Sequence, residues 1–82
     1  ALKFTKLASK HSPENMGIDF TLSNLIDYSE NKTHQKIMLE KSENSSFKEE
    51  DKIPLYFALG KSFNDQKNYS RSFYFYSLGN KI

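Results

Sequence analysis

Apolar side chains recur along the chain at helical spacing, and the alternating apolar-polar runs typical of strands are scarce. Three or four residues separate successive apolar positions, which predicts amphipathic helices. Five segments carry this pattern, and they cover approximately residues 1–11, 14–28, 33–42, 47–64 and 69–81. The second of them is expected to end between Tyr28 and Asn31. The sequence therefore predicts an all-α chain of about five helices.

Three of the predicted helices begin with a capping signal. Ser12-Pro13-Glu14 combines a capping hydroxyl, a Pro suited to the first helical position and an acid in the first turn. Thr33 can cap the third helix. Ser46-Phe47-Lys48-Glu49 has the form of a capping box. Pro54 fits without strain if the regular helix begins near Asp51, whereas an earlier start would place a kink there.

Residues 53–82 also follow a fixed order of small and large side chains. The order consists of Tyr56, Leu59, Gly60 and Phe63, followed by Ser72, Tyr76 and Gly79. Small residues at Gly60 and Ser72 would let the last two helices approach closely, with large rings filling the space beside the crossing. This order resembles the tetratricopeptide repeat (Trp-x-x-Leu-Gly-x-x-Tyr, then Ala-x-x-x-Phe).

The resemblance extends over nearly the whole chain. Ala8 and Pro13 have the spacing of the closing helix of one unit, residues 1–13. Residues 14–45 align as a degenerate unit and residues 46–82 as a well-formed one. The resemblance implies a single domain of antiparallel helical hairpins, stacked as a short right-handed α-solenoid. We expect this domain to be a fragment of a longer protein, with a role in protein–protein interaction or scaffolding.

One subfamily of the tetratricopeptide proteins resembles this chain more closely. The runs Phe57–Lys61, Asn68–Phe73 and Gly79-Asn80 are similar to the repeats of bacterial tetratricopeptide-sulfotransferase proteins. There the repeats precede a sulfotransferase-like domain. This resemblance implies an alternative function as an ancillary domain, with the catalytic domain beyond residue 82. No catalytic residue can be carried over from it.

Composition narrows the classes of function. With 37% hydrophobic and 15% aromatic residues, the chain is too apolar for a disordered tail. A net charge of +2 predicts neither a nucleic-acid nor an anionic-lipid partner. The chain contains no Cys, which suits a reducing compartment such as the cytoplasm. No apolar run approaches the roughly 20 residues that span a bilayer, so no membrane partner is expected.

The sequence also predicts no catalysis within these residues. It contains no Gly-rich phosphate loop and no nucleophile elbow. His11 and His34 are isolated and are interpreted as surface histidines, so neither a metal nor a cofactor is expected. The acidic run Glu49–Asp51 is explained by stabilisation of a helix N-terminus.

A peptide groove is the candidate binding site, on the surface formed by the first helix of each hairpin. The residues expected to line it are Phe20, Asn24, Asp27, Phe57, Lys61 and Asn64. The alternative is that Lys61 and Asn64 are ordinary solvated residues.

The aromatic residues of the last helix suggest a second surface. Phe73 and Tyr76 are expected on the buried face, which makes nucleobase stacking a poor alternative. Phe75, Leu78 and Ile82 are expected to be partly exposed. They would contact a following catalytic domain or a second copy of the chain.

Overall fold

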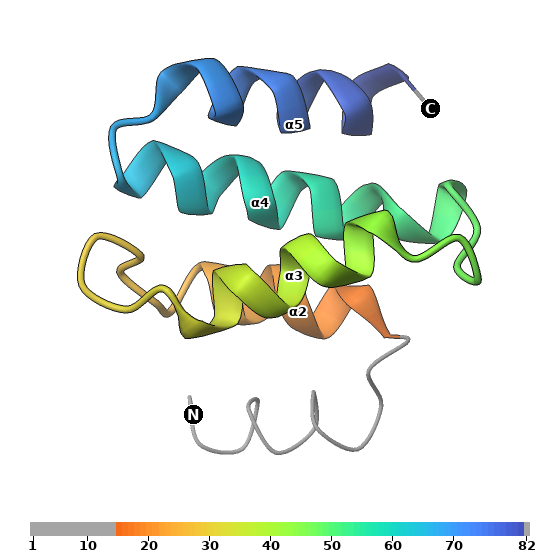
Figure 1. The fold of residues 1–82 in the computed structure, drawn as a ribbon, viewed down its shortest axis with the longest axis horizontal. Helices are drawn as coiled ribbons and strands as arrows, with labels where there is room; N and C mark the ends of the chain where they lie inside the picture. The colour runs from red at the N-terminus through yellow and green to blue at the C-terminus, as the bar shows by residue number, and fades with distance from the viewer. Residues whose placement is uncertain (1–14, 82) are drawn as a thin grey trace.

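The computed structural model describes residues 15–81, and within them the chain forms four α-helices and one short 3₁₀ helix. They are α2 (Met16–Ser23), α3 (Thr33–Glu43), the 3₁₀ helix η1 (Glu50–Lys52), α4 (Ile53–Asp65) and α5 (Tyr69–Lys81). Within this range there is no strand, which confirms the all-helical prediction for the described part. α4 lies between α5 on one side and the pair α2 and α3 on the other (Figure 1).

The central position of α4 follows from its sequence. The buried residues of α4 extend from Ala58 through Leu55 to Gly60, an arc of about 200° around the helix axis at ~100° per residue. A helix that is apolar on several sides has to be covered on all of them, and α4 packs against α2, α3 and α5. Pro54 lies in the first turn of α4, where its missing N–H leaves no intrahelical bond unmade. A start at Ile53 therefore accommodates the proline.

α4 and α5 form an antiparallel hairpin whose helices meet at Gly60 (Figure 1). Ser72 on α5 donates a hydrogen bond from its Oγ to the Gly60 carbonyl oxygen at 2.8 Å. A Cβ atom on Gly60 would lie only 2.8 Å from ring carbons of Tyr76. The ring of Tyr76 thus rests directly on the α4 backbone, a contact that any larger residue at position 60 would obstruct.

The rotation of α5 about its own axis differs from the prediction. Phe73 was expected to be buried and is 75% exposed, whereas Phe75 was expected to be partly exposed and is only 7% exposed. Both predictions are wrong. Ser72, Phe75 and Gly79 share the buried line of α5. Because Ser72 is fixed on Gly60, the next residue, Phe73, is turned about 100° away from that line.

The two hydroxyl caps predicted within residues 15–81, at Thr33 and Ser46, are wrong as well. Thr33 is the first residue of α3, and its backbone N–H donates to Asn31 Oδ1 at 3.1 Å. The capping box Ser46–Glu49 does not form, because the Ser46 N–H donates to Asn44 Oδ1 at 2.9 Å. Asparagine side chains therefore organise both turns, by bonding to the backbone two residues further on.

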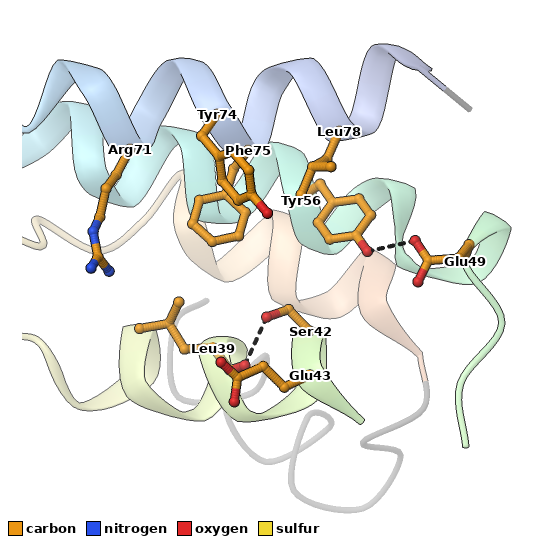
Figure 2. Close-up of a pocket in the computed structure, with 9 residues that line it drawn as sticks. All are labelled: Leu39, Ser42, Glu43, Glu49, Tyr56, Arg71, Tyr74, Phe75 and Leu78. Atoms are coloured by element: carbon orange, nitrogen blue, oxygen red, sulfur yellow. Dashed lines mark hydrogen bonds between the residues drawn. The ribbon is translucent and has the colours of Figure 1, made fainter. Parts of the chain in front are cut away.

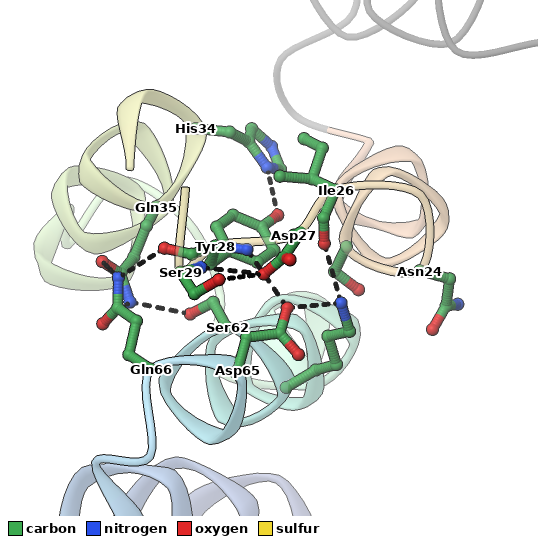
Figure 3. A network of polar contacts seen from close by, with 12 residues as sticks. Asn24, Ile26, Asp27, Tyr28, Ser29, His34, Gln35, Ser62, Asp65 and Gln66 are labelled. Carbon is green, nitrogen blue, oxygen red and sulfur yellow. Dashed lines mark hydrogen bonds and ion pairs between the residues drawn. The ribbon is translucent and has the colours of Figure 1, made fainter. Parts of the chain in front are cut away.

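α2 stops well before Tyr28, where the prediction had placed its end. The reason is a long-range contact of the loop 24–32 with the last turns of α4 (Figure 3). Lys61 Nζ donates to the carbonyl oxygen of Ile26 at 2.8 Å and to Asp65 Oδ2 at 2.6 Å. Asp65 Oδ2 also accepts the backbone N–H of Tyr28 at 3.2 Å. These bonds satisfy backbone groups that a longer α2 would have paired internally.

Two glutamines join α3 to the same end of α4. Gln66 Nε2 donates to Gln35 Oε1 at 2.9 Å, and Gln35 Nε2 donates back to Gln66 Oε1 at 3.1 Å. The remaining donors reach Ser62 Oγ at 3.0 Å and the Tyr28 carbonyl oxygen at 3.1 Å (Figure 3). Since buried amides are costly when unpaired, this mutual pairing fixes the loop, α3 and α4 together.

Some predictions lie outside the described residues. The closing helix of residues 1–13, with Ala8 and Pro13, and the terminal Ile82 are among them. The helix start at Ser12-Pro13-Glu14 lies outside as well. Within the described range, α2 and α3 fall in the predicted unit 14–45, and α4 and α5 fall in the predicted unit 46–82.

Adding one methyl group at each of two glycines tests the α4–α5 contact. Gly60→Ala places a Cβ against the Tyr76 ring. We expect it to lower the free energy of unfolding by about 1 kcal/mol, since overpacking outweighs the gain in helix propensity. Gly79→Ala is the matched control, because its Cβ would lie 3.2 Å from the tip of the Phe57 ring, which can move. Urea unfolding should show Gly79→Ala equal to or more stable than the parent. A stabilised Gly60→Ala variant would contradict the contact.

Candidate functional site

A groove of about 620 Å³ lies between α3 and α5, over a side chain of α4 (Figure 2). α3, the loop before η1, α4 and α5 all contribute to it. Its lining consists of Leu39, Ser42, Glu43, Glu49, Tyr56, Arg71, Tyr74, Phe75 and Leu78. The residues of α5 recur three or four positions apart, so one flank of this helix forms a whole wall.

The floor of the groove is apolar and fixed. Tyr56 and Phe75 are buried, and their rings stack with centroids 6.4 Å apart. Phe75 also stacks on Phe63 behind it, at 5.6 Å. Leu39 and Leu78 are half-buried on the two walls and pack against the core. Because these side chains are held by the core, the floor is already formed without an occupant.

Charged side chains stand at opposite ends of the groove. Arg71 belongs to the first turn of α5, whereas Glu43 is the last residue of α3. α3 and α5 run in the same direction, so the two charges lie at opposite ends (Figures 1 and 2). No ion pair among residues 15–81 includes either of them. The Arg71 guanidinium instead lies 5.6 Å from the centroid of the Phe63 ring, at cation–π distance.

Glu49 adds a second carboxylate at the Glu43 end. The Tyr56 hydroxyl donates to Glu49 Oε2 at 2.8 Å, and this hydrogen bond lowers the pKa of Glu49. Burial, together with the same bond, raises the pKa of Tyr56 to about 12. Lys52 is buried beside them and donates to the Ser42 carbonyl oxygen at 3.0 Å, at the C-terminal end of α3. The acidic end of the groove is therefore held in place by side chains of three elements.

A buried polar cluster links α2 to α3 beneath the loop. Asp19 on α2 is fully buried and accepts from Lys41 Nζ and from His34 Nε2, both at 2.8 Å. The other ring nitrogen of His34, Nδ1, lies 2.7 Å from the Tyr28 hydroxyl. When Nε2–H donates to Asp19, Nδ1 can accept from the Tyr28 hydroxyl, and every polar atom of the cluster has a partner. The prediction that His34 is a surface histidine is wrong, because its side chain is 11% exposed.

The order carboxylate, imidazole, hydroxyl also occurs in catalytic triads, but it has no access to a substrate here. Tyr28 and Asp19 have no exposed surface. Burial, together with the nearby carboxylates of Asp19 and Asp65, raises the pKa of Tyr28 and keeps its hydroxyl protonated. A protonated hydroxyl that cannot reach solvent is a poor nucleophile. We therefore interpret the cluster as a structural connection between two helices.

The residues of the predicted peptide groove are placed on α2, the following loop and α4. Phe20 is 42% exposed, and Asn24 and Asn64 are exposed as well. The ammonium group of Lys61 bonds to two groups of the chain itself. Asp27 Oδ1 accepts the backbone N–H and the hydroxyl of Ser29, which lowers the pKa of Asp27.

Phe57, the last of these residues, covers Gly79 on α5. The predicted set thus combines exposed side chains with side chains that serve the fold. The groove that the structure forms lies elsewhere, between α3 and α5. One signal in the sequence could have indicated it. Arg71, Tyr74 and Leu78 recur at helical spacing next to the buried line of α5, as a second and mixed stripe.

Three further observations bear on the class of function. In the part of the chain that the structure describes, no group of three or more His, Asp or Glu residues could hold a metal ion. No helix between residues 15 and 81 has the length and apolar character that a membrane crossing requires. No family model, curated protein or solved structure shows a significant match to the chain.

The buried ion pair can be tested with two lysines of α3. Lys41→Met leaves the Asp19 carboxylate buried without its cation, and we expect a loss of about 3 kcal/mol in the free energy of unfolding. Lys36→Met is the control, because Lys36 is exposed and should change stability by less than about 0.5 kcal/mol. Chemical denaturation measures both. Equal stability of the two variants would show that Asp19 does not depend on Lys41.

Proposed function

We propose that this chain is a protein-interaction module of the tetratricopeptide type, with a scaffolding role and no catalysis of its own. The arrangement of the described helices supports this proposal. α4 and α5 pair as an antiparallel hairpin, and α4 packs against both helices of the preceding segment. Repeat arrays stack their hairpins in this way, each unit burying its apolar face against the next. The close contact of Gly60, Ser72 and Tyr76 is also compatible with this type of packing.

The main support for this proposed function is the groove between α3 and α5. Its apolar floor is rigid, and its volume of about 620 Å³ lies in the ~300–1,000 Å³ range of binding pockets. Tyr74 stands at its edge with 57% of its surface exposed. Tyrosine and arginine are the residue types enriched where binding energy concentrates in interfaces, and this groove has both. We propose that it is the surface that contacts a protein or peptide partner.

The sulfotransferase association remains a second proposal, supported only by the residues of α4 and α5 that resemble that subfamily. Under this proposal the hairpins would position a catalytic domain elsewhere in the same protein. The sequence of the parent gene downstream of Ile82 would test the sulfotransferase association. A domain with a phosphate-binding loop would support the association, and continued repeats would contradict it. A cytoplasmic location would suit either proposal, since the chain has no Cys.

Two neighbouring aromatics of α5 allow a matched test of the groove. Tyr74 lines the groove, whereas Phe73 is exposed on another side of the same helix. A phage-displayed library of 16-residue peptides would be selected on the intact chain, and the affinities of enriched peptides measured by fluorescence anisotropy. We expect Tyr74→Ala to weaken binding about tenfold, equivalent to 1.4 kcal/mol, because it removes an interfacial aromatic.

Phe73→Ala should leave the affinity within about twofold of the parent, since surface contacts outside the interface contribute little. Circular dichroism of both variants controls for folding. If the library yields no peptide above background, the proposed function is wrong. If Phe73→Ala abolishes binding and Tyr74→Ala does not, the interaction surface lies on the other flank of α5.

A further inference from the structure

Resting on the proposed function, we infer that the groove between α3 and α5 accepts one face of a short amphipathic helix of a partner protein, oriented antiparallel to both. The partner helix carries a basic side chain at the end next to Glu43 and Glu49. It carries an acidic side chain at the end next to Arg71. Three features of the groove lead to this assignment: its length, its charges and the direction of its walls.

The length of the groove matches two turns of helix. Arg71 and Leu78 are seven residues apart on α5, which corresponds to about 10 Å along the helix axis. An occupant of two turns would place apolar side chains at positions i, i+3 or i+4, and i+7 along this distance. The groove volume of about 620 Å³ is large enough for three such side chains, which Leu39 and Leu78 would contact from the two walls.

The charges at the two ends are available for an occupant. Arg71 and Glu43 take part in no ion pair within residues 15–81. Glu49 accepts one hydrogen bond from Tyr56, and its side chain remains 66% exposed. Among residues 15–81, the cation that pairs with Glu49 is Lys52, which lies 3.5 Å away and is itself bound to the end of α3. The acidic end can therefore accept a basic side chain, and opposite charges favour one orientation of the occupant over the other.

The directions of α3 and α5 favour the same orientation. Both walls run from the Arg71 end towards the Glu43 end (Figure 1). Their positive dipole ends therefore lie near Arg71, and the negative end of α3 lies near Glu43. A helix that enters antiparallel places its own positive end next to Glu43 and Glu49. The dipoles of the two walls and the charged side chains of the groove therefore favour the same antiparallel orientation of the partner helix.

Two synthetic peptides of identical composition test the orientation. The forward peptide has Lys in its first turn, three Leu at the anchor positions and Glu in its last turn. The second peptide has the reversed sequence. The same side-chain lactam on the solvent face of each peptide equalises their helicity. At 50 mM salt we expect the forward peptide to bind the intact chain about fivefold more tightly, because the reversed peptide can pair its charges with the groove only by lying parallel to α3 and α5, against their dipoles.

Charge reversal on the protein provides the control. The double variant Arg71→Glu, Glu43→Lys should invert the preference, so that the reversed peptide binds more tightly. The matched double variant Lys81→Glu, Glu30→Lys keeps the net charge and changes exposed residues outside the groove, and it should retain the forward preference. Circular dichroism checks that both variants fold.

The outcomes separate this inference from the proposed function. Equal affinities of the two peptides, or a preference that the groove variant does not alter, would overturn the inference. If library-selected peptides depend on Tyr74 while neither synthetic peptide binds, the inference is wrong and the interaction module stands. If no peptide of any kind binds, the proposed function fails together with the inference.

Discussion

The contact of the Tyr76 ring and the Ser72 hydroxyl with Gly60 determines how α5 lies on α4, and the rest of the structure depends on it. Because Ser72 Oγ bonds to the Gly60 carbonyl oxygen, the rotation of α5 is fixed. Phe75 then points into the core, and Arg71, Tyr74 and Leu78 form a wall of the groove. The same rotation leaves Phe73 in solvent. A single small residue therefore decides which side chains of α5 build the core and which are offered to a partner.

The opposite wall is positioned by a different kind of interaction. α3 is held by polar contacts: Asp19 binds His34 and Lys41, and Gln35 pairs with Gln66. Such contacts contribute modestly to net stability when intact, and they are costly to break singly. They tolerate few alternative placements, because any shift of α3 would leave the Asp19 carboxylate unpaired. We therefore attribute the separation of α3 and α5, and hence the groove between them, to steric contact on one side and buried charge on the other.

The sequence predicted the parts of this fold that local patterns determine. The helical class and the positions of α4 and α5 follow from apolar spacing and from Pro54 near a helix start. The end of α2 could not be predicted, because it depends on bonds between the Tyr28 N–H and Asp65, which are 37 positions apart. The predicted burial of Phe73 and Phe75 was the reverse of the observed burial. The buried face of α5 was assigned one or two residues away from its true position, and each residue corresponds to a rotation of about 100° around the helix axis. The groove itself involves α3 and α5, and no local pattern predicts where these two helices lie relative to α4.

The fold described above requires the Tyr76 ring to lie on the backbone of Gly60. Isotope-edited NOESY spectra of the intact chain measure this contact directly. We expect cross-peaks between the Gly60 Hα protons and the Tyr76 ring protons, with the Hα resonances shifted upfield by the ring current. Cross-peaks from Gly60 to the Phe73 ring in place of Tyr76 would mean that α5 is rotated differently. In that case the groove, with Arg71 and Tyr74 on its wall, would not exist.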